Sequence, residues 1–415
     1  MTVTKRVLAT LALSVSFLAC SAPRPLPSQS KAAQAPPAAE APAPLQGVEL
    51  VKGFVVGEGK QFDNLTIFPV LAREQPDLGP FTTLEAALSR HEAEVREMGE
   101  GAQVNTLTVE NKGKTPIFIL AGTVLEGGKQ DRQVGQDVVV GAEQAVNIDA
   151  FCVEQGRWTA SRAGRVTGGK FGPAKVLADS SVRTAGQYKK NQSEVWSEVS
   201  KVNGANHKES ASSALAASLD DAELRAERER AAGAIGSFFD DLKPANDAVG
   251  FAYAVDGKVR GVRWFVNHQI FGLFRGALTE SAAAEASTAR RAAKASATPP
   301  PPAPRVAATD VRAFLDEVDK APVAEERATA GENVNTYRES KSGYGSKVKF
   351  SKARLPSSSP TPAAADVTLS SDFVSKKEGP EKPAELHLQP SDELPNEMGR
   401  HQIRKMPMRH VERRR

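Results

Sequence analysis

Two short stretches of the sequence hold the side chains best suited to chemistry. The first, AGTVLEGGKQDRQVG at 121–135, follows an apolar run, and the second, FCVEQGRW at 151–158, also ends a strand-like run. Both are therefore expected in loops carried by a rigid scaffold, where binding sites commonly lie. The candidate residues are Lys129, Gln130 and Arg132 in the first stretch and Cys152, Glu154, Arg157 and Trp158 in the second.

These side chains fit a polar cleft for a small anion. Lys129, Arg132 and Arg157 would contact the negative charge, because ammonium and guanidinium groups make strong, charge-assisted hydrogen bonds. Gln130 would orient the ligand by hydrogen bonding, and Trp158 would offer an aromatic stacking face. The sequence thus predicts a ligand-binding module, and it identifies no cofactor.

Two alternatives use the same residues. In an enzyme of the hydrolase type, Glu154 would be the general acid and base, with Cys152 or a water molecule as nucleophile. None of the six histidines lies near Cys152 in sequence, and a free cysteine is more often a small buried residue. In a structural protein without a ligand, Glu154 would form a salt bridge with Lys129 or Arg132. No metal site is expected, because zinc-ligand spacing is missing.

The glycine-rich stretches do not form a nucleotide-binding phosphate loop. GRVTGGK at 164–170 has the required glycine–lysine spacing, but Phe171 stands where a serine or threonine should hold magnesium. The first stretch has one residue too many before its lysine. A nucleoside triphosphatase is therefore excluded. The glycines expected to serve turns or bulges are Gly122, Gly127, Gly128 and Gly156.

The first twenty residues predict export. Lys5 and Arg6 precede an apolar run of signal-peptide length that ends in FLAC, with the cysteine at Cys20. This ending resembles the lipobox of bacterial lipoproteins, in which the cysteine carries the lipid, although Phe17 replaces the usual leucine. The resemblance implies a lipid anchor at Cys20, and Ser21 after it implies the outer membrane. An ordinary secretory signal is the alternative.

Composition predicts extended segments on both sides of one folded domain. Residues 21–47 contain seven prolines and eight alanines, which is typical of an extended linker. Residues 353–415 are polar and end in a basic cluster, so we expect a disordered tail. The net charge of +4 on 415 residues gives no reason to expect a nucleic-acid partner.

Residues 48–352 are expected to form a single α+β domain. Its first half reads as mostly antiparallel β-strands with one threonine-capped helix at 81–98. Helices concentrate in the second half, where Asp256-Gly257 predicts the turn of a β-hairpin. The remaining expectations are helices at 193–242, 268–295 (with Gly276 as a point of interruption) and 309–321, and a proline-rich insertion at about 298–304.

The order of these blocks resembles the ARG and Rhodanese-Phosphatase-superfamily-associated Protein domain family. The match rests on VNTLTVENKGKTPIFILAGTVLEGGKQDR followed by FCVEQGRW. It departs from the family pattern at Thr123, where a glutamate is expected. The family context implies a link to ADP-ribose or NAD metabolism, and hence a phosphorylated, ADP-ribose-like ligand. The residues that the resemblance marks are Asn105, Asn111, Gly122, Gly127, Lys129, Gln130, Arg132, Cys152, Glu154, Gly156, Arg157 and Trp158.

Overall fold

The computed structural model describes most of the predicted domain. The chain divides into Met1–Pro44 and Leu45–Arg415, and the helices and strands described below all belong to the second unit. Cys20, residues 298–303 of the proline-rich insertion and the basic chain end lie outside the described residues. No helix of the described part is long and apolar enough to cross a membrane. The described ranges are 44–98, 105–162, 165–172, 176–295, 304–328, 333–351 and 366–376.

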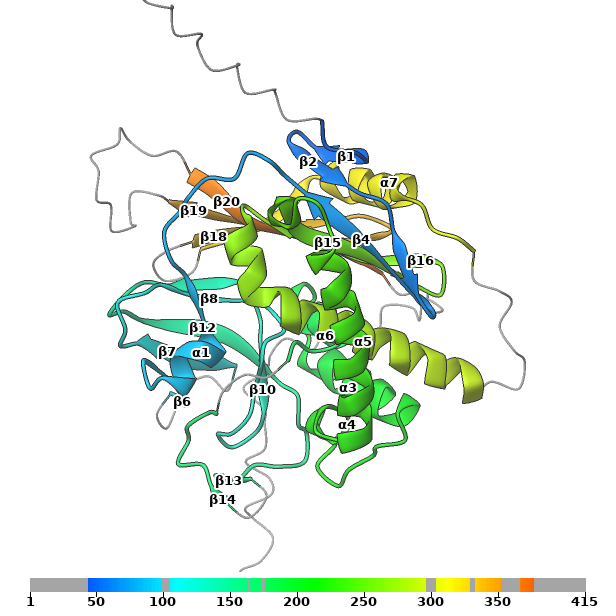
Figure 1. The fold of residues 1–415 in the computed structure, drawn as a ribbon. Helices are drawn as coiled ribbons and strands as arrows, with labels where there is room; N and C mark the ends of the chain where they lie inside the picture. Colours follow the sequence, from blue (N-terminus) through cyan, green and yellow to red (C-terminus); the bar gives the residue numbers. More distant parts are fainter. Residues whose placement is uncertain are drawn as a thin grey trace, which may run out of the picture. The chain divides into compact units, whose positions relative to one another are not determined.

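A large antiparallel sheet brings together strands from both ends of the domain (Figure 1). The predicted hairpin is confirmed: Asp256 and Gly257 both have positive φ, 50° and 75°, as a type I′ turn requires. In spatial order the strands are β1 (Val48–Val51), β2 (Phe54–Val56), β4 (Leu65–Leu71), β15 (Ala248–Val255), β16 (Lys258–Phe265), β20 (Asp366–Ser375), β19 (Gly343–Ser351), β18 (Asn333–Glu339) and β17 (Val323–Ala328), with β3 (Lys60–Phe62) paired to β4.

Three smaller sheets form a β-rich unit beside the large one. Asn111 is buried, and its Nδ2 donates to the carbonyl of Val140 at 3.2 Å, which ties two of these sheets together. The predicted antiparallel character of the first half is confirmed, with one parallel pair, β5 and β8. The sheets are β6 (Ala93–Glu97), β7 (Thr106–Asn111), β12 (Ala145–Cys152), β10 (Arg132–Val134) and β9 (Val124–Leu125); β11 (Val138–Val140), β8 (Ile117–Ile119) and β5 (Thr82–Thr83); and β13 (Ser161–Arg162) with β14 (Arg165–Val166).

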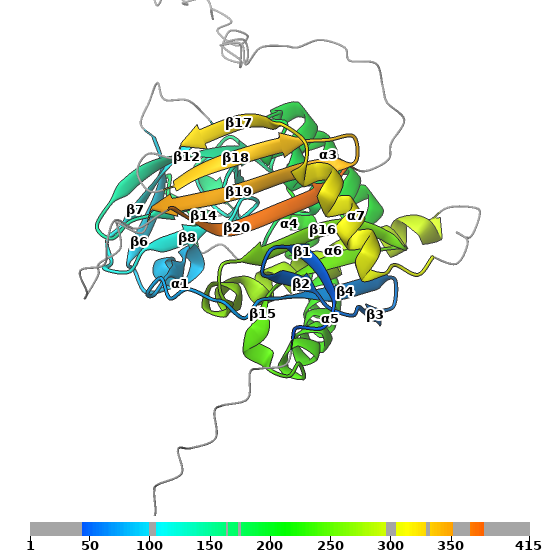
Figure 2. The same cartoon turned by 90° about the horizontal axis from the view of Figure 1, so that it is seen from above.

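Apolar side chains cover both faces of the large sheet. Successive residues of a strand point to opposite faces, so Phe265 packs with α6 while Trp264 packs with α7. On α7, Val311, Leu315 and Val318 recur at helical spacing and are fully buried. Figure 2 shows α7 over the sheet near β16 and β20. The helices are α1 (Leu84–Ser89), α2 (Ser180–Gln187), α3 (Gln192–Ala205), α4 (Ala216–Leu219), α5 (Ala222–Asp240), α6 (His268–Ala295) and α7 (Ala308–Asp319), with a 3-10 turn η1 (Ala245–Asp247).

The expected helix at 81–98 is much shorter in the structure. Thr83 is the N-cap, as expected, and accepts a hydrogen bond from the Ala86 amide at 3.1 Å. The helix ends at Ser89, because His91 has a φ of 59° and turns the chain back. Residues 93–97 then form strand β6, with Ala93 and Val95 buried on one face. By contrast, α6 runs through Gly276 without a break.

The domain boundary expected at residue 352 requires correction. Asp366–Ser375 was expected in a disordered tail, but it forms β20, between β16 and β19 in the large sheet. Its central residues Ser370, Ser371 and Asp372 are polar, so the segment lacks the apolar pattern that predicts a strand. All three are at most 2% exposed, and buried partners satisfy the polar side chains of Ser370 and Asp372.

Candidate functional site

Strands β10 and β12 place the two sequence blocks side by side. In this antiparallel pair Arg132 faces Cys152 directly. Just beyond it, the Val153 amide donates to the Asp131 carbonyl at 3.0 Å, so the polar residues of both blocks leave the sheet at one edge. The sequence prediction that the blocks adjoin therefore agrees with the register of this pair.

Arg157 connects the two blocks through its guanidinium group. Its Nε donates to Glu154 Oε2 at 2.8 Å, and its Nη2 lies 3.1 Å from Asp131 Oδ1. The same group donates to the carbonyls of Gly127 and Gly128, each at 3.0 Å. The Arg157 side chain thus holds together the Gly127–Gly128 turn, Asp131 of the first block and Glu154 of the second.

Arg162, which no sequence motif indicated, extends this cluster. Arg162 Nε lies 3.1 Å from both oxygens of Asp131, and its other nitrogens pair with Glu126 and Asp220, each at 3.3 Å. Burial raises the pKa of Asp131. The hydrogen bond from the Gly127 amide and the charges of Arg162 and Arg157 oppose this increase but do not cancel it. Position within the Lys-Gln-Asp-Arg block was the one available signal for Asp131. The described carboxylates form no group that could hold a metal ion.

Burial separates the expected ligand contacts into two kinds. Gln130 and Arg132 are 4% and 1% exposed, and Glu154 is 5% exposed. Lys129 is exposed and its Nζ lies 5.6 Å from the ring centroid of Trp158, which is 52% exposed. Only these two of the expected contacts present their side chains freely to solvent.

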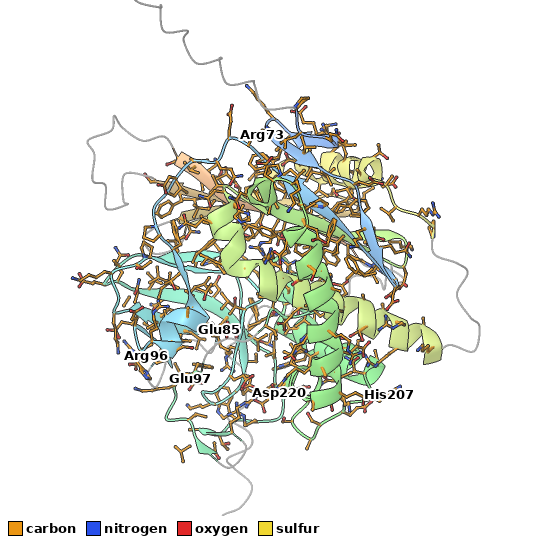
Figure 3. The ribbon with its side chains drawn as sticks, viewed as in Figure 1. Arg73, Glu85, Arg96, Glu97, His207 and Asp220 are labelled. Carbon is orange, nitrogen blue, oxygen red and sulfur yellow. The ribbon has the colours of Figure 1, made fainter. Side chains whose placement is uncertain are left out.

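Glu97 supports the exposed corner from β6, the edge strand of the same sheet. Its Oε1 accepts from the Lys129 backbone amide at 2.8 Å and lies 3.7 Å from Arg132 Nη2. Figure 3 labels Glu97 and Asp220, the acids that contact this region from β6 and from the end of α4. The backbone carrying Lys129 is thus fixed independently of the lysine side chain.

Cys152 is buried beneath this cluster. Burial raises the pKa of its thiol, although the charge of Arg132 acts in the opposite direction. Its backbone amide and carbonyl both bond to the Gln192 side chain of α3, each at 2.8 Å. The Cys152 thiol is therefore protonated at neutral pH, and the protonated form is a weak nucleophile.

The four expected turn glycines lie at tight approaches. Gly127 has a φ of 138°, and a Cβ there would meet the Lys170 carbonyl oxygen at 2.4 Å. Gly122 has a φ of 84° and packs against the Arg183 side chain. Gly128 also has positive φ, whereas Gly156 faces the Ser212 backbone without it. These positions favour glycine for steric reasons.

A second buried polar cluster joins the large sheet to the β-rich unit. Arg263 Nη2 lies 2.6 Å from Asp137 Oδ2, and Arg263 also faces Asp372 across the β16–β20 ladder. Arg183 of α2 donates to the same Asp372. Asp137 in turn accepts from the Ala121 amide at 2.7 Å. Two buried cations are matched by two buried anions, which is the requirement for burying charge.

None of these four residues belongs to the two sequence blocks that predicted a site. Arg263 lies in the hairpin and Asp137 follows the first block, and neither has a charged residue next to it in the sequence. Their contacts have large sequence separations, 126 residues for Arg263 and Asp137 and 189 for Arg183 and Asp372. Arg263 and Asp372 lie inside strands, and a charge within a buried strand was the available signal for these two residues.

Fold and site together define a class: an α+β domain whose polar sequence blocks form a charged cluster at the edge of a β-rich unit. A family model matches residues 53–359, and the chain belongs to that family, the ARG and Rhodanese-Phosphatase-superfamily-associated Protein domain. Its membership confirms the resemblance found in the two blocks. Searches of curated proteins and of solved structures find no match to the chain.

Proposed function

We propose that this protein is an exported, membrane-tethered binding module for an anionic, phosphorylated ligand such as ADP-ribose. The observation that carries the proposal is the exposed Lys129–Trp158 pair on a backbone held by Arg157 and Glu97. An ammonium group carried on a fixed backbone, beside a half-exposed indole, offers a charge contact for phosphate and a stacking face for a base.

The buried residues of the motif act as the scaffold of this site. Arg157, Asp131 and Glu154 hold the two loops together, so that little conformational entropy is lost when a ligand binds. Gln130 and Arg132 contribute beneath the surface rather than by touching the ligand. The proposed contact surface is therefore smaller than the cleft that the sequence suggested.

The binding proposal is tested with ADP-ribose as the probe, titrated calorimetrically into the full chain. Lys129→Ala and Trp158→Ala are each expected to weaken binding roughly tenfold or more, since a hydrogen bond to a charged group or a stacked base contributes ~1.5–3 kcal/mol. Lys114→Ala is the matched control, because Lys114 is also an exposed lysine, on the turn between β7 and β8. Inorganic pyrophosphate and adenosine separate the charge contact from stacking.

A structural role without a ligand is the second candidate, and the burial of Arg132, Asp131 and Glu154 favours it. In that case ADP-ribose, pyrophosphate and adenosine give no binding signal with the wild type or with either variant. Lys129→Ala and Trp158→Ala then also leave the free energy of unfolding unchanged. Such a result would reject the binding module while leaving the salt-bridge cluster in place as a scaffold.

The tether rests on the apolar run that ends at Cys20. Two or more acyl chains on this cysteine would anchor the protein durably, at ~0.8 kcal/mol per buried CH₂. The Cys20→Ala variant should then leave the membrane fraction of cells and lose incorporation of labelled palmitate. Continued fractionation of this variant with outer membranes would reject lipid anchoring.

A further inference from the structure

A groove on another part of the domain contains an arginine without a partner. The groove has a volume of about 980 Å³ and lies among α2, α3, α6, the β15–β16 hairpin and the ends of β19 and β20. That volume is at the upper end for small-molecule sites, ~300–1,000 Å³. None of the residues in the Lys129–Trp158 corner lines it.

The β-bulge in the hairpin determines where Arg260 lies. Tyr253 faces Gly261 and Ala254 faces Val259, so Arg260 is the extra residue of β16 with no partner on β15. Bulges of this kind redirect a side chain and are frequent beside functional sites. Arg260 lines the groove instead of joining the regular alternation of the strand.

The guanidinium of Arg260 is half-buried and unpaired. Its Nε is shielded from solvent and has no hydrogen-bond partner, and Arg260 forms no ion pair with any described residue. A shielded cationic group without a partner is costly. An anionic occupant would remove that cost.

Other charges that line the groove already have partners. Lys189 pairs with Glu194 across the start of α3, and Lys201 pairs with Glu198. Lys376 pairs with Glu339 and lies over the Tyr344 ring. Glu285 accepts from Tyr253 Oη at 3.0 Å, and Asp179 caps α2 through Ser181. Among the charged side chains that line the groove, Arg260 is thus the one with neither a side-chain hydrogen bond nor an ion pair to a described residue.

We propose that the groove binds a small organic anion, a carboxylate or a phosphate ester, whose charged group pairs with Arg260. The planar guanidinium accepts either oxyanion in a bidentate manner. The hydroxyl of Ser375, which also lines the groove, supplies a hydrogen bond for the rest of the molecule. This site is independent of the Lys129–Trp158 corner.

Arginine modification by phenylglyoxal, mapped by mass spectrometry on the full chain, tests this proposal without any mutation. Citrate and inorganic pyrophosphate are the probes for the two oxyanion classes. We expect at least one of them to protect Arg260 saturably. Arg230 on α5 is the internal control, because it is exposed and makes no ion pair with a described residue. Equal reactivity of Arg260 with and without both anions, or equal protection of Arg230, would overturn the proposal.

The second measurement is the shift in melting temperature caused by the protecting anion. Arg260→Gln is expected to lower the apparent affinity roughly tenfold or more, as loss of a hydrogen bond to a charged group predicts. Arg230→Gln removes the same charge and should keep the wild-type affinity. Lys129→Ala and Trp158→Ala should also keep it, so failure here can be distinguished from failure of the ADP-ribose proposal. An unchanged affinity in Arg260→Gln would reject this assignment.

Discussion

Arg157 Nη2 lies 3.1 Å from Asp131 Oδ1 and joins two loops whose residues are 26 positions apart. The Asp131 carboxylate also receives the Gly127 amide at 3.0 Å, and Glu154 receives the Asp131 amide at 3.1 Å. Each acid therefore has both a cationic and a backbone donor. Asp131 and Arg157 therefore stabilise the two loops as a pair.

Replacing Arg157 should destabilise the fold strongly. Arg157→Ala would leave Glu154 without its guanidinium donor. Asp131 would keep the Arg162 guanidinium and the Gly127 amide as donors. Removing one partner of a buried ion pair costs ~3–5 kcal/mol in free energy of unfolding. Arg275→Ala is the control, because the Arg275–Asp240 pair is 32% and 64% exposed and should contribute ~0–1 kcal/mol. Urea unfolding measures both, and equal losses in the two variants would contradict the clamp role.

Local patterns explain what could be predicted of the fold. The hairpin at Asp256-Gly257 and the Thr83 cap depend on one or two residues with defined backbone preferences, and the structure has both. Strand β20 could not be predicted, because its polar residues suit a strand only once Arg263 and Asp137 lie opposite them. That information lies in contacts between distant parts of the chain.

The sequence predicted that the two blocks adjoin, but not how deeply their side chains are buried. Arg132 begins β10 and Cys152 ends β12, so both lie at the ends of strands next to the predicted loops. The register of the two strands pairs these residues directly. Whether Arg132 faces solvent depends on Glu97 from β6, which lies outside both motifs, and on the turn that brings the Gln130 carbonyl to its guanidinium. The same pattern of charged residues in the sequence is compatible with an open cleft and with a closed network.

The correction of the domain boundary leads to a truncation prediction. A chain ending at residue 352 lacks β20 and removes Asp372, the partner of Arg183 and Arg263 in the sheet. We expect that chain to lose cooperative thermal unfolding by circular dichroism. A chain ending at residue 376 keeps β20 and should unfold as the full chain does. Cooperative unfolding of the shorter chain would show that β20 is dispensable.

Glu325 on β17 should make stability depend on pH. Hydrogen bonds from Arg327 and Lys190 lower the pKa of Glu325 from 4.5 to about 2, against the opposing effect of burial. A lowered pKa in the folded state means that the stabilisation is fully present above pH 4.5 and is lost as the pH falls toward 2. The side chain is 38% exposed, so solvent screening reduces the effect.

The Glu325 measurement compares unfolding free energies of wild type and Glu325→Gln across that pH range. The wild type should be the more stable protein at neutral pH, and its advantage should shrink as the pH falls below 4.5. Glu326→Gln removes the same charge from the adjacent exposed residue and reports the effect of net charge alone. An advantage that is constant with pH would argue against the ion pair.

The accessibility of Cys152 distinguishes a closed cluster from an open catalytic cleft. The residue is 3% exposed and burial raises its thiol pKa, so thiolate and reagent access are both limited in the folded protein. Iodoacetamide should therefore label Cys152 only after unfolding in guanidinium chloride, with peptide mass spectrometry to separate it from Cys20. Cys152→Ser is the control for labelling elsewhere. If Cys152 in the folded protein reacts as fast as in denaturant, the cleft is open at the thiol, and Glu154 with Cys152 becomes the better-supported pair for catalysis.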